Sequence, residues 1–471
     1  MQDQAQDAAE QPSDGAGATA ERFAPPRIAP LPDGASTLTT MRATIANPIA
    51  ALPASIYESF IAPQRGGAMI VDPEILDEIL VKRARDFTKT EINRRIFTPV
   101  LGQGLLSAEG EDWRWKRRLS APPFAPSALE AMAPAFAAPF EALAARWAGA
   151  ARAASQREDV NAAMVATTLD VIGQVLFADG AEIDQGLIAR QLDAYLRPAS
   201  WTAVGAILGA PEWTPYPGKG RQACAKRLLR GAVATMIAKR RNAAEAGEPA
   251  PEDLTTALLA ARDPETGRPL SDSDMIDMVL TLVAAGHETT AHSLTWTLYC
   301  LAHQPALQES LAEEARGAAS IPAGGETMAA LPRIEAAVKE TLRLFPVAPL
   351  IARRAAKPER FGDLDLPEGA LISIPIYALH RHPALWGDPD AFDLDRFLGK
   401  QDPPRTRYMP FGAGPRICIG ARMAMMEAVH GLAALLRALR FEPCEDTAFE
   451  PLHRVTLRPK DGLILAISAR A

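Results

Sequence analysis

Cys418 is the residue whose type and setting most clearly suggest chemistry. It lies in the glycine-rich stretch F-G-A-G-P-R-I-C-I-G, from Phe411 to Gly420, and apolar, helix-forming residues follow from Ala421. A helix that begins there points backbone N–H groups and the positive end of its dipole at the loop, which favours a thiolate with a lowered pKa. A thiolate binds soft or borderline metals, haem iron among them, and glycines let the backbone approach a flat ligand. The alternative is a small buried hydrophobic residue, as most lone intracellular cysteines are.

A second suggestive group is the run Ala285-Gly286-His287-Glu288-Thr289-Thr290. It stands in the middle of a helical pattern that begins at an S-x-x-D capping box, Ser271-Asp272-Ser273-Asp274, and continues for roughly 30 residues to about His303. The flanks are apolar on nearly every side, so we expect this helix to be buried. Gly286 weakens the helix, the Thr289 hydroxyl can bond back to the Ala285 carbonyl, and a buried acid beside a hydroxyl can relay protons. An ordinary glycine–threonine kink with a solvated glutamate is the alternative.

Two further pairs have the spacing of neighbours on one helix face. Glu340 and Arg343 stand three residues apart among apolar neighbours, so we expect a buried ion pair that serves folding. Trp113 and Arg117 stand one helical turn apart and present an indole N–H and a guanidinium on the same side. For each charged residue the alternative is a solvated surface position, which is the commoner case.

Together these motifs resemble the signature sequences of the cytochrome P450 family. The family's haem loop, F-x-x-G-x-R-x-C-x-G, is matched at every fixed position, and the A-G-x-E-T-T, E-x-x-R and W-x-x-x-R motifs are also present in the family's order. The resemblance covers about residues 36–471. It departs from the family at Leu394, where proline is usual, close to the expected second arginine, Arg396.

The resemblance implies a role for each motif. Cys418 would be the axial ligand of the iron of heme b, Thr289 would hydrogen-bond dioxygen, and Glu288 would help to carry protons inward. Ala285 and Gly286 would leave room over the iron, and Phe411 would shield the thiolate. The residues expected to hold the haem are Trp113, Arg117, Ala285, Arg353, Phe411, Arg416, Cys418 and Gly420. The residues expected to line the substrate pocket are Leu105, Ala284, Val347, Ala348, Leu350 and Ile351. The residues expected to stabilise the fold are Glu340, Arg343 and Arg396.

The function implied by the resemblance is that of a soluble, bacterial-type haem-thiolate monooxygenase. Such an enzyme takes two electrons and dioxygen, inserts one oxygen atom into a lipophilic substrate and releases the other as water. No flavin or iron–sulfur segment follows the haem motifs, so we expect electrons from a separate ferredoxin or flavodoxin with its reductase. The cations expected to dock that partner are Arg114, Lys116, Arg118, Arg405, Arg407 and Arg422. A peroxygenase or isomerase, or a non-enzymatic haem sensor, is the alternative, and the Glu288–Thr289 pair argues against all three.

Composition sets the remaining limits. The chain has 471 residues, 48% of them hydrophobic, and a net charge of −7, so we expect a large core and neither nucleic acid nor an anionic membrane as a partner. Its cysteines form no C-x-x-C pair, which argues against a disulfide framework or zinc site and fits a reducing cytoplasm. We find no signal peptide and no run of about 18 apolar residues, so no membrane span is expected.

The pattern of the chain predicts a mainly α-helical fold with a small β portion, in one large domain with a long central helix. Residues 1–22 are polar and predicted to be a disordered tail, and residues 23–471 are the haem-thiolate domain. We expect an irregular stretch at 87–110 and a breaker-rich connection at 198–217. Besides the central helix, helices are expected at about 73–84, 127–151, 159–178, 185–196, 219–246 and 254–261, and strands at 55–60, 68–71 and 463–468.

Overall fold

The computed structural model describes residues 22–64, 66–151, 155–178, 183–399 and 402–470. The tail expected over 1–22 lies outside these residues except for Arg22, whose guanidinium pairs with Asp393 at 2.6 Å. Phe23 stacks on His303 with ring centroids 4.7 Å apart. The proline-rich segment after Arg22 therefore begins on the body of the protein.

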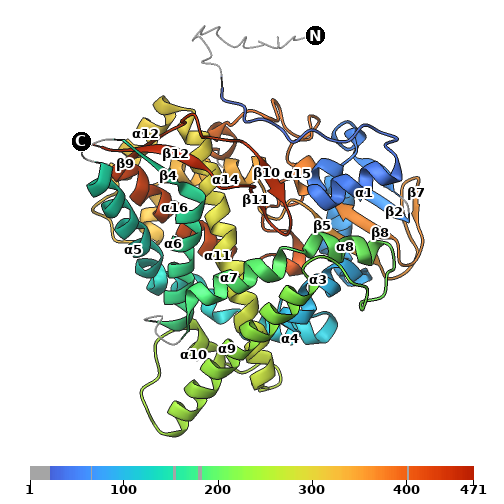
Figure 1. The fold of residues 1–471 in the computed structure, drawn as a ribbon, viewed down its shortest axis with the longest axis horizontal. Coiled ribbons are helices and arrows are strands. Elements are labelled where there is room, and N and C mark those ends of the chain that lie inside the picture. Colours follow the sequence, from blue (N-terminus) through green and yellow to red (C-terminus); the bar gives the residue numbers. More distant parts are fainter. Residues whose placement is uncertain (1–21, 65, 152–154, 179–182, 400–401, 471) are drawn as a thin grey trace, which may run out of the picture.

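Helices dominate the architecture, and the long central helix passes through the middle of the molecule (Figure 1). The helices of the described residues are α1 (Thr37–Ala46), α2 (Pro73–Asp77), α3 (Glu91–Leu101), α4 (Gly110–Ser120), α5 (Pro126–Ala151), α6 (Val160–Phe177), α7 (Gln185–Leu196), α8 (Ala199–Ile207), α9 (Lys219–Glu245), α10 (Leu254–Ala260), α11 (Asp272–Ala302), α12 (Pro305–Gly317), α13 (Gly325–Ala329), α14 (Pro332–Leu344), α15 (Ile376–Leu379) and α16 (Ala421–Ala438).

The strands form small sheets beside the helical body. The strands are β1 (Ile61–Gln64), β2 (Gly67–Ile70), β3 (Phe87–Thr88), β4 (Gln156–Asp159), β5 (Ile351–Ala355), β6 (Glu359–Phe361), β7 (Leu364–Leu366), β8 (Leu371–Ile374), β9 (Leu439–Glu442), β10 (Pro451–His453), β11 (Leu457–Pro459) and β12 (Ile464–Ala469). One sheet has the order β1-β2-β8-β5-β3 and another the order β4-β12-β9, while β10 pairs with β11 and β6 with β7. The mainly α-helical prediction with a small β portion is confirmed.

The central helix α11 forms where the sequence predicts it. Ser271 accepts from the Asp274 N–H and the Asp274 carboxylate accepts from the Ser271 N–H, which confirms the capping box. α11 packs against α6, α9, α14 and α16, and most of its side chains are buried. It can therefore hold catalytic side chains rigidly at the centre of the domain.

Three local predictions are wrong. Residues 91–101 form α3 instead of a loop, because Thr90 caps the helix by accepting from the Asn93 N–H and Ile96 packs into the core. Residues 199–207 form α8, which begins directly after Pro198 and buries Val204. The segment 54–57 is a 3-10 helix and the first strand lies further on, at β1.

One helix, α6, is long and apolar enough to cross a membrane, judged by length and composition alone, contrary to the expectation that no segment would be. Of its residues, 61% are buried in the protein, where the helix packs between α5 and α11. Its apolar surface is therefore explained by its place in the core.

Candidate active site

The loop that carries Cys418 rests on a short π-helix, Glu78–Lys82. Gly414 has φ 69°, and a Cβ atom built there would lie 1.8 Å from the Leu80 carbonyl oxygen. A side chain at this position would push the loop off its support. The Cys418 N–H donates to the Phe411 carbonyl at 2.9 Å, and α16 begins at Ala421 as predicted.

The Cys418 side chain is accessible to water but has protein around it on nearly every side. Burial raises the pKa of its thiol, and the Gly420 N–H and the Arg117 charge lower it only in part. The sequence predicts a lowered pKa for this thiol. In the structure, desolvation raises the pKa by more than the start of the helix lowers it. A bound iron ion would supply the positive charge that stabilises the thiolate here.

The middle of α11 is the accessible part of an otherwise buried helix. Ala285 is exposed, and Ala284, Glu288 and Thr289 are partly buried. Thr289 Oγ1 donates to the Ala285 carbonyl at 2.8 Å, the bond expected from the sequence, although α11 is not interrupted there.

Gly286 lies where α6 packs against α11. A Cβ atom built on Gly286 would lie 2.7 Å from Ile172 Cδ1, so its missing side chain lets α6 approach α11. Gly286 therefore has a packing role here, and its expected role over the iron stays a prediction.

Glu288 and Thr289 hydrogen-bond to different parts of the protein. Glu288 Oε2 accepts from Thr456 Oγ1 at 3.4 Å, so the carboxylate faces the turn between β10 and β11. Thr289 bonds to its own helix. A proton that moved between the two would need a water molecule or a substrate group in between.

Sequence reasoning missed Glu427 on α16. This carboxyl is buried and accepts from Thr290 Oγ1 at 3.0 Å, which joins α16 to α11 beside Thr289. Burial raises its pKa to about 8, and the Thr290 bond lowers it only in part. The available signal was an acid in the apolar run between Met423 and Leu436.

We expect Glu427→Gln to change how stability depends on pH. The pKa of Glu427 is about 8 in the folded protein, against 4.5 for an ordinary glutamate side chain. Between these values the unfolded state loses a proton that the folded state keeps, so wild-type stability falls as pH rises and levels off above about 8. Gln keeps the acceptor for Thr290 and does not titrate, so the variant should melt several degrees above wild type near pH 8.5 and with little difference near pH 4.5.

The control is Glu313→Gln, at an exposed position of α12, which should leave the pH profile of the melting temperature unchanged. Parallel profiles for Glu427→Gln and wild type would show that Glu427 is ionised in the folded protein.

A cationic cluster lies beside the Cys418 loop. Arg416 Nη1 and Lys89 Nζ both donate to the Ala108 carbonyl, at 3.1 and 3.0 Å. Burial and the neighbouring Arg416 lower the pKa of Arg353 to about 10 and that of Lys89 to about 7. Among the described residues, Glu109, 3.6 Å from Arg416, is the one acid that raises either pKa, so the cluster has a surplus of positive charge.

Lys89 is a second residue that sequence reasoning missed, because nothing in F-T-K-T distinguishes it from a surface lysine. Of the adjacent arginines on β5, Arg353 belongs to the cluster and Arg354 is exposed, as strand alternation requires. Trp113 lies beneath Arg416, whose Cζ is 4.5 Å from the ring centroid. Burial lowers the pKa of Arg117, and the charge of Cys418 raises it.

These residues fit a haem. The accessible sulfur of Cys418 suits the iron, and the surplus charge of Lys89, Arg353 and Arg416 suits two propionates. The group would be held by residues from α4, β5 and the Cys418 loop, together with the lysine after β3.

The residues expected to stabilise the fold form one buried cluster. Glu340 and Arg343 are both 0% exposed and are joined by two hydrogen bonds of 2.7 Å. Arg396 Nε lies 3.3 Å from Glu340, and the Asp393 N–H donates to the same carboxylate at 2.9 Å. Leu394, in place of proline, is buried in a 3-10 helix that Asp393 caps, so the departure leaves Arg396 beside Glu340.

The residues expected to line the substrate pocket differ in accessibility. Ala348 is exposed, and Val347 is buried with its carbonyl accepting from the Leu457 N–H at 2.9 Å. The remaining residues are partly buried: Leu105, Ala284, Leu350 and Ile351.

One expected docking cation is not at the surface. The Lys116 side chain is 2% exposed, and its Nζ lies 2.9 Å from both Asp112 and Asp274. Arg118 is bound to Asp263 at 3.1 Å. The buried face of α4 therefore includes Trp115 and Lys116, contrary to the expected pattern of cations alternating outward.

Three features of this mainly helical fold define a haem-thiolate protein. They are an accessible cysteine on a glycine loop, a buried central helix with an exposed centre, and a cationic cluster beside them. The chain belongs to the cytochrome P450 family, whose model matches residues 54–466.

The comparisons include two proteins of Streptomyces melanosporofaciens. Cyclooctatin synthase is 33% identical over 398 residues, covering 82% of this chain and 83% of that protein. Cyclooctat-9-en-7-ol 5-monooxygenase is 31% identical over 409 residues, covering 85% of each. Cytokinin hydroxylase of Arabidopsis thaliana is 29% identical over 405 residues, covering 84% of this chain and 78% of that protein. The chain is a haem-thiolate monooxygenase that uses dioxygen, an organic substrate and redox partners.

Proposed function

We propose that this protein holds heme b through Cys418 and oxidises a lipophilic substrate beside the exposed centre of α11. The observation that carries the proposal is the accessible Cys418 sulfur together with Ala285, exposed on a helix that is otherwise largely buried. The residues that would hold the haem are Lys89, Trp113, Arg117, Ala285, Arg353, Phe411, Arg416, Cys418 and Gly420. Residues 23–471 would form one catalytic domain, with 1–22 as a tail.

When bound, the haem supplies the iron that activates dioxygen with two electrons. The chain's own contribution is to hold the substrate in an apolar pocket and to deliver protons. Thr289 would hold a hydrogen bond at the reacting oxygen, and Glu288 would pass protons to it from the turn that contains Thr456. The lining residues Ala284, Val347, Ala348, Leu350, Ile351 and Leu105 are apolar and mostly small, which supports a medium to large lipophilic substrate.

We expect Thr289→Ala to uncouple turnover. Nicotinamide oxidation should continue while hydrogen peroxide replaces most of the organic product, because the hydroxyl that directs protonation is gone. The measurement is the ratio of product to NADH consumed, with Thr295→Ala as the control, since Thr295 makes the same bond to its own helix in a buried position. An unchanged ratio in Thr289→Ala would place the relay elsewhere.

The electron donor would be a small acidic ferredoxin or flavodoxin with its reductase, in the cytoplasm. Three exposed or partly exposed cations lie on or near the Cys418 loop and α4: Arg114, Arg405 and Arg422. They are the members of the docking surface expected from the sequence that remain, since Lys116 and Arg118 are bound to carboxylates and the partly buried Arg407 lies over the Trp386 ring. Such a surface on an acidic protein would steer an acidic partner.

The experiment that tests the function is reconstituted turnover with NADH, a reductase, a ferredoxin or flavodoxin, and isotopically labelled dioxygen. A library of lipophilic compounds would first be screened for those that shift the haem iron from low to high spin. We expect one labelled oxygen atom in the product. Unlabelled product, or product formed only with added peroxide, would contradict the proposal.

A further inference from the structure

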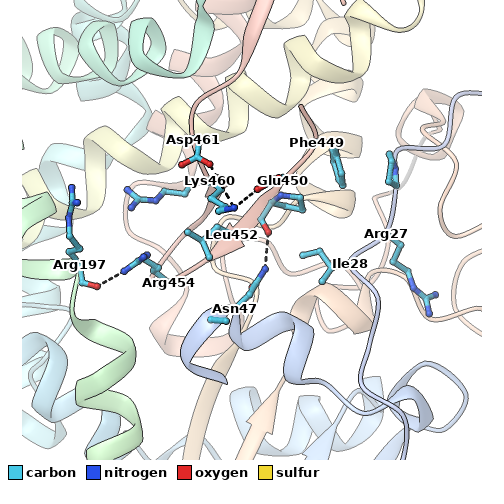
Figure 2. A pocket seen from close by; sticks show the side chains of 14 residues that line it. Arg27, Ile28, Asn47, Arg197, Phe449, Glu450, Leu452, Arg454, Lys460 and Asp461 are labelled. Carbon is cyan, nitrogen blue, oxygen red and sulfur yellow. Dashed lines mark hydrogen bonds and ion pairs between the residues drawn. The ribbon is translucent and has the colours of Figure 1, made fainter. Parts of the chain in front are cut away.

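A cavity of about 870 Å³ lies where the start of the chain meets its end. It is bordered by residues 26–28, the end of α1, Arg197 after α7, and the hairpin β10–β11 with its flanking segments (Figure 2). Ile28, Phe449 and Leu452 give it an apolar part, and five cationic side chains, two acids and Asn47 form most of the rest of its lining.

Two of these cations already have partners. Lys460 Nζ lies 2.6 Å from Glu450 and 3.8 Å from Asp461 (Figure 2). The Arg27 guanidinium lies over the ring of Tyr57, 4.2 Å from its centroid, and 3.9 Å from Asp390. Neither provides free positive charge to the cavity.

Of the remaining three cations, Arg197, Arg454 and Arg458, two pair with the same carboxylate. Asp193 lies 2.6 Å from Arg197 and 3.6 Å from Arg458. Arg454 donates to the Arg197 carbonyl, and burial together with the charges of Arg458 and Arg197 lowers its pKa. The Nε atoms of Arg454 and Arg458 are buried and make no hydrogen bond within the described part of the chain.

This arrangement leaves the cluster two positive charges in excess within a protein whose net charge is −7. Guanidinium groups that repel one another and have free donors favour an anion with planar, paired acceptors. A carboxylate has that shape. An ion pair that served only to hold the hairpin against α7 would need only Asp193 and one arginine.

The hairpin that carries Arg454 and Arg458 also borders the candidate active site. Thr456, in the same turn as Arg454, donates to Glu288 on α11 at 3.4 Å. The Leu457 N–H donates to the Val347 carbonyl, next to the exposed Ala348. The short turn between β10 and β11 therefore connects Arg454 and Arg458 to residues proposed to line the substrate pocket.

We propose that Arg197, Arg454 and Arg458 bind the carboxylate of the substrate, which would be a long-chain lipophilic acid whose apolar part reaches past the hairpin toward α11. This inference rests on the proposed function and narrows its substrate class.

The test measures binding of hexadecanoate, methyl hexadecanoate and inorganic phosphate to the haem-loaded protein by isothermal titration calorimetry. In Arg454→Gln/Arg458→Gln, hexadecanoate should bind about tenfold or more weakly, while the ester changes by less than about twofold. Added salt should weaken wild-type binding of the acid but not of the ester. The control is Arg360→Gln, at an exposed arginine of β6 paired only with Asp365 and the Gly362 carbonyl among the described residues, which should bind both ligands as wild type does.

Equal losses for acid and ester in the double variant would overturn the proposal, since they would mark the arginines as structural. Phosphate binding that depends on the arginines, with no preference for acid over ester, would also overturn it, because the site would then serve a free anion. The reduced carbon monoxide spectrum of each variant reports the haem site separately. A variant that keeps this spectrum but fails to discriminate acid from ester leaves the proposed monooxygenase function intact.

Discussion

Replacing Cys418 by Ser should abolish the red-shifted absorbance of the reduced carbon monoxide complex and all monooxygenase turnover. The sulfur of Cys418 is accessible and lies beside Arg117, in a loop fixed by the Cys418–Phe411 backbone bond. A hydroxyl in its place is a much weaker donor to iron, so the variant would lose the thiolate on which oxygen activation depends. Absorbance spectra of the dithionite-reduced protein under carbon monoxide measure the effect directly.

The matched control is Cys224→Ser. Cys224 is exposed on α9, whereas Cys300 is buried in α11 and Cys444 is half-buried beside Ile464. Cys224→Ser should keep both the spectrum and the turnover. A Cys418→Ser protein with the wild-type spectrum would show that another residue holds the iron.

Glu340→Ala should cost about 3–5 kcal/mol of folding stability, because it leaves Arg343 charged and buried without its carboxylate. Arg343 is 0% exposed, and its other hydrogen bonds go to the carbonyls of His380, Pro389 and Ala391. These acceptors carry no full charge and cannot replace Glu340. We expect a lowered melting temperature, little soluble protein and poor haem content.

Glu111→Ala is the control of matched spacing. Glu111 and Arg114 also stand at i and i+3 and pair at 2.5 Å, but their side chains are 66% and 37% exposed. Breaking an exposed pair costs about 0–1 kcal/mol, so this variant should melt close to wild type. If both variants lost the same stability, burial would not be the source of the effect at Glu340.

Sequence reasoning succeeded where the information is local. The haem-loop and E-x-x-R motifs have fixed spacing within one segment, and the capping box at Ser271 needs only four consecutive residues. The central helix and α7 were therefore predicted with nearly correct ends.

It failed where a residue's role depends on a distant partner. Nothing near Gly286 in the sequence indicates that Ile172 occupies its missing side chain's place. Lys116 looks like a surface cation until Asp274, on another helix, is brought to it. Lys89 and Glu427 were missed for the same reason, since each gains its unusual pKa from burial against elements far along the chain.

The contact between Gly414 and the Leu80 carbonyl also has a consequence for the order in which the protein is made. The ribosome releases Leu80, Ala108 and Trp113 long before the Cys418 loop that rests on them. Contacts between such distant segments form slowly, because a long chain must close first. The haem site therefore cannot be completed before the Cys418 loop has been made, so haem capture should follow translation of that loop.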